Sequence, residues 1–103
     1  MSIKEDFQIP ENLNNIYKLM EISPVGILRS YALNLIHGKI SRYEVESRYF
    51  EKKYNCSFDE FKNRIESMEE EENFEWDDDF MDWKFAFENL LYWQKKLQEL
   101  EIE

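Results

Sequence analysis

The last quarter of the chain, from Asp77 to Glu101, constrains the fold more than any other segment. Its large apolar residues recur at alternating steps of three and four, at Trp83, Ala86, Leu90, Trp93, Leu97 and Leu100. This spacing is typical of the seam along which one helix packs against another. No glycine or proline interrupts residues 80–103. We therefore predict a long amphipathic helix over about residues 77–101.

The predicted helix is long for a domain of this size. About 25 residues at roughly 1.5 Å each give a length of about 38 Å. A compact domain of about 100 residues has a radius of gyration near 13 Å, and is therefore about 26 Å across. Because the rest of the chain would leave part of the seam uncovered, we expect either that the end of the helix frays or that it packs against a second chain, a partner protein or another copy.

Composition favours a few long helices, since only two glycines and two prolines are available for turns. Of the net charge of −10, residues 52–103 contribute −9, from seven Lys and Arg against sixteen Asp and Glu. Such a segment repels nucleic acid and anionic membranes and attracts basic proteins.

No stretch has the length and apolarity of a membrane span. The single cysteine, Cys56, and a first segment without a signal-peptide core lead us to expect a cytoplasmic protein.

Capping residues divide the chain into helices. Ser23-Pro24 and the capping-box patterns Ser41–Glu44 and Ser57–Glu60 predict helix starts. Gly38 and Asn55 predict helix ends, because both residue types tolerate the left-handed conformation found there. Trp76 is expected to fold back over the start of the last helix as a hydrophobic staple.

The predicted fold is therefore all-α, with four to five helices arranged in helical hairpins. We expect residues 1–22 to form an N-terminal arm with a short helix, and residues 23–103 to form a single helical domain.

The sequence contains little that indicates a catalytic site. His37 is the only histidine and precedes a predicted helix end, where a capping role is the usual one. Cys56 has no histidine near it in sequence. The acidic stretch from Glu69 to Asp82 lacks the spacing and the glycine of a calcium loop, so we interpret it as a solvated face. We expect no enzyme activity, no metal ion and no cofactor.

A weak nucleic-acid pattern lies in the middle of the chain. Four basic residues, Arg42, Arg48, Lys52 and Lys53, interleave with tyrosines. Helices over 41–54 and 57–68 could mimic a helix-turn-helix. Acidic residues on the same two helices would weaken phosphate contacts, so a salt-bridged solvent face is the favoured interpretation.

The run Lys53-Tyr54-Asn55-Cys56-Ser57-Phe58-Asp59-Glu60-Phe61 leads through an acidic stretch to Asp79-Phe80-Met81-Asp82-Trp83. This pattern, over about residues 45–100, resembles the small acidic antitoxins of prokaryotic toxin–antitoxin modules. In that family a KYG-S-EEF helix hairpin precedes an acidic helix that carries DWE. Here Asn55 replaces the glycine, and Lys84 stands where the family often has glutamate. The resemblance implies a protein that neutralises a cognate toxin, often a ribonuclease-like one.

These observations predict a partner-binding surface on the last helix, made of Asp79, Asp82, Trp83, Phe87, Leu90, Trp93, Leu97 and Leu100. Large aromatic residues dominate interface energies, and the carboxylates would steer a basic partner. We expect a basic protein partner, such as a toxin, and a homo-oligomer, a dimer or higher, when the chain is alone. Two alternatives remain open: a DNA-binding regulator that uses residues 41–68, and a homo-oligomeric structural protein.

Overall fold

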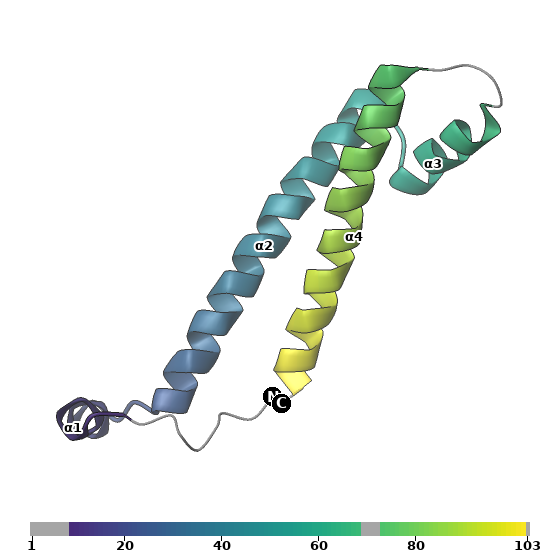
Figure 1. Ribbon diagram of the computed structural model, residues 1–103. Helices are drawn as coiled ribbons and strands as arrows, with labels where there is room; N and C mark the ends of the chain where they lie inside the picture. Colours follow the sequence, from purple (N-terminus) through teal and green to yellow (C-terminus); the bar gives the residue numbers. More distant parts are fainter. Residues whose placement is uncertain (1–8, 69–72, 103) are drawn as a thin grey trace. The chain divides into compact units, whose positions relative to one another are not determined.

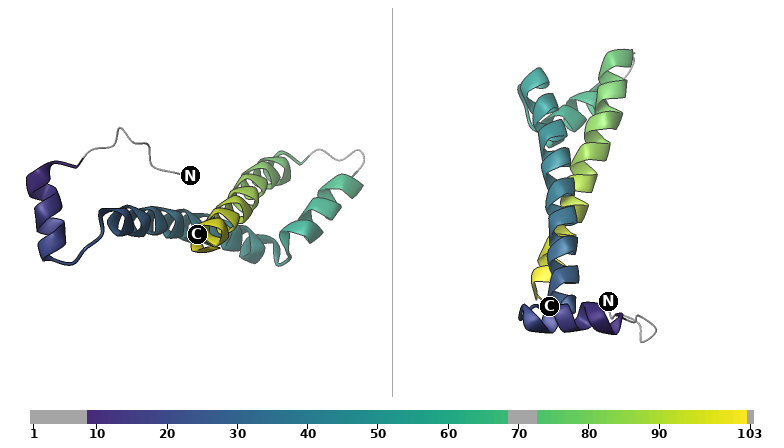
Figure 2. Two further views of the ribbon diagram at one scale, coloured as in Figure 1. Left: turned by 90° about the horizontal axis from the view of Figure 1, so that it is seen from below. Right: turned by 90° about the vertical axis from the view of Figure 1, so that its left-hand side faces the viewer.

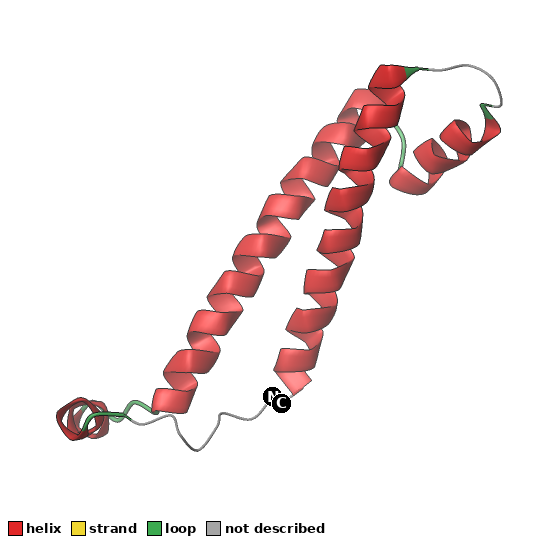
Figure 3. Ribbon diagram, viewed as in Figure 1, coloured by secondary structure: helices red, strands yellow, loops and turns green. Residues whose placement is uncertain are grey.

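The computed structural model describes residues 9–68 and 73–102, and within these ranges it contains four α-helices and no strand (Figures 1 and 3). The helices are α1 (Glu11–Leu19), α2 (Pro24–Tyr54), α3 (Phe58–Ser67) and α4 (Phe74–Ile102). The predicted all-α class and the long C-terminal helix are confirmed. Residues 69–72 of the acidic stretch lie outside the described residues.

The helix α2 is continuous where the sequence predicted a break. It runs through Gly38 without a positive φ, and Ser41–Glu44 lie inside the helix rather than at its start. The predicted stop at Gly38 and the predicted capping box at Ser41 are therefore wrong. A mid-helix glycine costs only about 1 kcal/mol relative to alanine. Inward-facing residues on either side of Gly38, such as Ile36 and Tyr43, can offset a cost of that size.

Other helix ends follow the predicted capping. Ser57 and Glu60 form the reciprocal capping box at the start of α3, where the Glu60 N–H donates to Ser57 Oγ at 3.2 Å. Asn55 adopts a φ of 53° between α2 and α3. At the start of α2, the Gly26 N–H donates to Ser23 Oγ at 3.3 Å.

The start of α4 differs from the prediction. The helix begins at Phe74, three residues before the predicted Asp77. The cap is Asn73, whose Oδ1 accepts the Trp76 N–H at 3.1 Å. Trp76 is therefore part of the first turn and not a staple folded over it; its ring packs on Tyr54, with 5.8 Å between centroids.

The chain divides into two compact units, Met1–Asn34 and Leu35–Glu103, so the division falls within α2 rather than after residue 22. In the first unit, α1 and the first turns of α2 enclose a shallow apolar groove, lined by Ile9, Pro10, Leu13, Tyr17, Pro24, Ile27 and Leu28. None of the described residues of this unit, 9–34, is buried. The first turns of α2 thus belong with α1, which explains why the boundary lies inside the helix.

The second unit holds the aromatic core. Residues 35–54 of α2 run antiparallel to α4, and α3 packs against α4 after a sharp corner (Figure 2). Phe50, Phe58, Phe61 and Trp83 form the centre of the core. The inward side of α2 also has the steps of four and three that mark a helix–helix seam, at Ile36, Ile40, Tyr43, Ser47, Phe50 and Tyr54. All six of these residues are buried or half-buried.

Candidate functional site: an apolar groove between α2 and α4

The residues of the predicted seam of α4 differ in burial. Trp83 and Ala86 are 0% exposed, and Leu90, Trp93, Leu97 and Leu100 are half-buried. The first two belong to the core of the second unit, so this part of the stripe is not accessible to another protein.

Trp83 is a core residue rather than an interface anchor. Its indole Nε1–H donates to Ser47 Oγ at 3.0 Å, and its ring stacks on Phe50 with 5.8 Å between centroids. Since the side chain has no exposed surface in this fold, the prediction that it contacts a partner directly is wrong. Phe87 is half-buried and stacks on Phe58 at 4.7 Å, so the core also holds much of this predicted anchor.

The predicted steering residue Asp79 already has partners within the chain. Its carboxylate accepts a hydrogen bond from Lys53 Nζ at 2.6 Å and another from the Tyr54 hydroxyl. Lys53 also forms an ion pair with Glu75 at 2.9 Å. The cluster joins the last turn of α2 to the first turns of α4, so its role in the described structure is to hold these two helix ends together.

The pKa values of the cluster reflect this pairing. Burial disfavours the ionised form of Asp79, but the hydrogen bonds from Lys53 and Tyr54 more than offset it and lower its pKa below the usual range. Burial, followed by the hydrogen bond to Asp79, raises the pKa of Tyr54 to about 12. The hydrogen bonds to Asp79 and Glu75 raise the pKa of Lys53. The cluster is thus a stable ion pair at neutral pH.

Most of the predicted nucleic-acid residues are also paired. Arg42 lies 3.4 Å from Glu46, and Arg48 lies 2.9 Å from Glu44. Lys53 is held by Asp79, and only Lys52 of the four makes no ion pair in the described parts of the chain. Carboxylates beside these cations compete with the phosphate contacts that dominate nucleic-acid affinity. The geometry therefore favours the salt-bridged solvent face.

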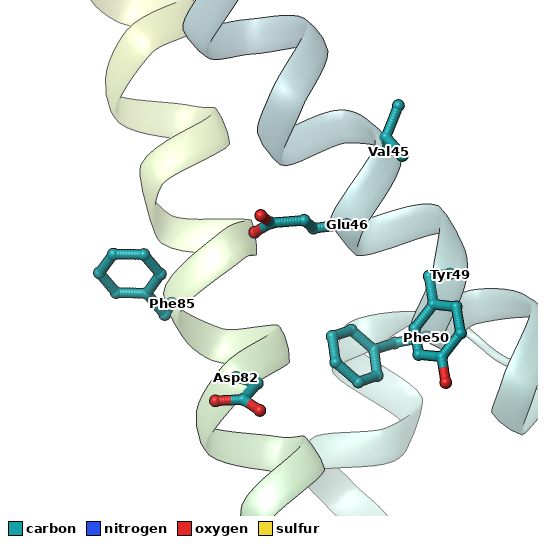
Figure 4. A pocket seen from close by; sticks show the side chains of 6 residues that line it. All are labelled: Val45, Glu46, Tyr49, Phe50, Asp82 and Phe85. Atoms are coloured by element: carbon teal, nitrogen blue, oxygen red, sulfur yellow. The ribbon is translucent and has the colours of Figure 1, made fainter.

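A different surface of the second unit is open. A groove of about 390 Å³ runs between α2 and α4, lined by Val45, Glu46, Tyr49, Phe50, Asp82 and Phe85 (Figure 4). In Figure 4, Glu46 and Phe50 extend from α2 towards α4, while Asp82 and Phe85 project from α4. We call these six residues the α2–α4 groove. Asp82 is the one predicted partner-binding residue that it contains.

The rim of the α2–α4 groove exposes large apolar side chains. Val45 is 66% exposed, Tyr49 60% and Phe85 57%. Phe85 is held in place by an edge-on contact with the ring of Tyr43, with 5.9 Å between centroids. An exposed apolar patch rimmed by polar residues is typical of a binding surface.

The sequence contained a signal for Phe85, one residue of this groove, that the seam analysis missed. Phe74, Met81, Phe85 and Tyr92 are spaced by seven, four and seven residues along α4, and all four are more than half exposed. Such spacing places them on one side of a helix, here the side away from the core. A search for a second apolar line, in addition to the strongest one, would have found it.

Two carboxylates line the α2–α4 groove. Glu46, on α2, is paired with Arg42, and its side chain is 42% exposed against 60% for Arg42. Asp82, on the α4 side, makes no ion pair within residues 9–68 and 73–102. The groove thus combines exposed apolar side chains with an unpaired carboxylate, an arrangement that suits an apolar ligand carrying positive charge.

Two other kinds of site are not found among the described residues. They contain no cluster of three or more His, Cys, Asp or Glu side chains placed to bind a metal ion. None of their helices has the length and apolarity needed to cross a membrane.

No protein-family model matches this chain, and neither the curated proteins nor the solved structures include one that is significantly similar to it.

Proposed function

We propose that the chain is a helical protein-binding module, an antitoxin-like inhibitor that binds a basic protein and masks its functional surface. The observation that carries the proposal is the α2–α4 groove, where exposed Val45, Tyr49 and Phe85 lie beside Glu46 and Asp82. The antitoxin-like pattern of residues 45–100 supplies the class of partner, a toxin such as a ribonuclease. A cytoplasmic location belongs to the same proposal.

The charge of the second unit supports a basic partner. Residues 35–103 carry ten Lys and Arg against nineteen Asp and Glu, a net charge of −9. A surface of one sign accelerates the approach of a protein of the opposite sign and disfavours nucleic acid. A nuclease active site that binds RNA is basic for the same physical reason.

Photo-crosslinking from inside the groove tests the proposal. A photoreactive amino acid replaces Val45 in the full chain, and the cross-linked proteins in a lysate of the source cells are identified by mass spectrometry. We expect a basic protein, whose cross-link disappears when Phe85→Ala is added. The purified partner should then show a ribonuclease or other toxic activity that the chain suppresses.

The matched control places the same photoreactive group at Ile102, which is 78% exposed at the end of α4 and outside the groove. Equal yields of one partner from both positions would mean that the groove does not select it. If the chain binds the partner but does not change its activity, the chain is a binding module and the proposed inhibition is wrong.

A second candidate, self-association, is favoured by the first unit. Eight of its large apolar residues are exposed: Leu13, Ile16, Leu19, Met20, Val25, Ile27, Leu28 and Tyr31. Residues 9–34 carry two basic and two acidic residues, so copies would meet there without net repulsion. A nine-residue helix such as α1 is marginal in water unless its apolar side is covered. We therefore propose that residues 9–34 form a homo-oligomer interface, separate from the α2–α4 groove.

A further inference from the structure

We infer that the occupant of the α2–α4 groove is an amphipathic α-helix of the partner, with apolar residues on one side and Lys or Arg flanking them. The inference rests on the proposed protein-binding function and specifies the chemistry of the segment that binds. It follows from the two helices that line the groove, their exposed apolar residues and the negative charge of the second unit.

The helices that line the groove favour a helical occupant. The groove is lined by residues of two antiparallel helices, α2 and α4 (Figure 1). Val45 and Tyr49 are one turn apart on α2, as are Asp82 and Phe85 on α4. A helix inserted between them presents residues at i, i+3, i+4 and i+7 with the same repeat. An edge-paired strand is not an alternative here, because both rims are helices whose backbone groups bond internally.

The size of the groove fits a few side chains. Its volume is about 390 Å³, and its six lining residues come from about one turn of α2 and one turn of α4. Tyr49 and Phe85 are rigid rings on opposite rims, which suits them to hold an apolar anchor between them. The partner helix would therefore insert its apolar side and leave its charged flanks at the rims.

The charges favour a cationic helix over a second copy of this chain. Glu46 and Asp82 both line the groove. Glu46 is paired with Arg42, whereas Asp82 is exposed and makes no ion pair among the described residues, so its carboxylate is available to a cationic side chain. Another copy would bring a second unit of net charge −9 against the first, and repulsion between like charges disfavours that arrangement. Burial of Asp82 against an apolar or acidic surface would leave a carboxylate without a partner.

A second hollow, between α3 and α4, serves as a comparison. It is lined by Phe58, Asp59, Lys62, Phe80, Lys84, Phe87, Glu88 and Leu91. Its rims carry two cations and two anions, so charge does not select a ligand of either sign. A cationic helix should therefore prefer the α2–α4 groove.

The test uses a model helix and the full-length chain. The probe is a fluorescent peptide of about four turns, built from leucine and lysine with leucine at the a and d heptad positions. The same peptide with glutamate in place of lysine is the charge control. We expect the lysine peptide to bind, seen as a rise in fluorescence anisotropy, and the glutamate peptide to bind at least tenfold more weakly. A photoreactive leucine in the probe should cross-link to residues 45–49 or 82–85.

Matched variants locate the binding. Phe85→Ala should weaken it by about fivefold or more, as expected for an aromatic anchor. Asp82→Asn should weaken it by about two- to threefold and reduce its salt dependence. The controls are Phe74→Ala and Asp77→Asn, exposed residues of α4 outside the groove, and each should change the affinity by less than about twofold. Circular dichroism checks that every variant keeps its helix content.

Three results would overturn the inference. Equal affinities for the lysine and glutamate peptides would show that charge does not select the occupant of the groove. Equal losses from Asp77→Asn and Asp82→Asn would show diffuse attraction to an acidic chain rather than a site. Cross-links between two copies through residues 45–49 would place a second copy in the groove. If the photo-crosslinked partner of Val45 instead presents a loop or a strand, the protein-binding function stands and the helical occupant is wrong.

Discussion

At the scale of single residues, one buried hydrogen bond fixes the centre of the second unit. The Trp83 indole is fully buried and its only polar atom donates to Ser47, itself 4% exposed. Buried polar groups cost free energy unless they are paired, so this contact specifies which residue of α2 stands opposite Trp83. The bond therefore sets the register of α2 against α4, and with it the pairing of residues across the α2–α4 groove.

Ser47→Ala should destabilise the second unit because it leaves the indole N–H without an acceptor. We expect a loss of about 1–3 kcal/mol in the free energy of unfolding. Each kcal/mol lowers Tm by about 4–8 °C in a domain of this size. In a Trp83→Phe background the same substitution should cost clearly less, since no donor remains. Urea titrations of the wild type, the two single variants and the double variant give the coupling free energy between Ser47 and Trp83. Equal losses of stability in the two backgrounds would show that the hydrogen bond does not stabilise the fold.

The lowered pKa of Asp79 predicts a contribution to stability that is lost in acid. Its pKa is lower in the folded chain than in the unfolded chain, so unfolding takes up a proton as the pH falls. The stabilisation is present above about pH 4, the ordinary pKa of the side chain, and is lost as the pH falls through the lower folded value. Asp79→Asn should therefore be less stable than the wild type at pH 7, with a difference that shrinks below about pH 4.

The control for this prediction is Asp77→Asn, because Asp77 is exposed and makes no ion pair among the residues that the structure describes. Urea titrations at a series of pH values give the stability difference directly. A difference between wild type and Asp79→Asn that does not change from pH 7 to pH 3 would show that Lys53 and Tyr54 do not stabilise the carboxylate.

At the scale of helices, Gly38 tests whether α2 is continuous, as packing favours, or ends at the glycine, as the local capping signal predicted. In α2 it is helical, and a Cβ added there would meet no atom within 4 Å. Gly38→Ala should therefore stabilise the second unit, by about 0.5–1 kcal/mol, through a smaller loss of backbone entropy. If Gly38 instead ended a helix in the left-handed conformation, alanine would destabilise the chain. The sign of the change in Tm distinguishes the two structures.

The helices also show which sequence signals were sufficient to predict where helices begin, end and pack. The seam of α4, the capping box at Ser57 and the turn at Asn55 were predicted because each depends on residues close in sequence. Ser41–Glu44 carries the same capping pattern as Ser57–Glu60, yet lies inside α2. No local rule separates these two cases, because the continuity of α2 depends on packing between its inward side and residues distant in sequence.

The candidate site was harder to predict than the fold. Trp83 and Phe87 looked like anchors because large aromatics serve both cores and interfaces. Only three-dimensional contacts show that Phe50 and Phe58 cover them. Of the eight predicted partner-binding residues, Asp82 alone lines the α2–α4 groove, because the strongest apolar stripe of a helix faces its own core.

At the scale of the whole molecule, the two units differ in charge and burial, and this difference predicts how the full chain associates. Residues 9–34 are apolar, uncharged overall and without a buried side chain, whereas residues 35–103 have a core and a net charge of −9. Light scattering of the purified chain should therefore give at least twice the monomer mass. Ile16→Asp with Val25→Asp should return it to the monomer, because both remove exposed apolar surface from the first unit.

These two substitutions are chosen to keep the helices intact. Ile16 is half exposed, and Val25 lies in the first turn of α2, where a carboxylate interacts favourably with the helix dipole. Phe85→Asp is the matched control in the second unit, and it should leave the mass of the oligomer unchanged. A monomeric wild type at every concentration would exclude self-association through the first unit. A monomer produced by Phe85→Asp alone would place the contact between copies in the α2–α4 groove, which the partner helix could then enter only by displacing a copy.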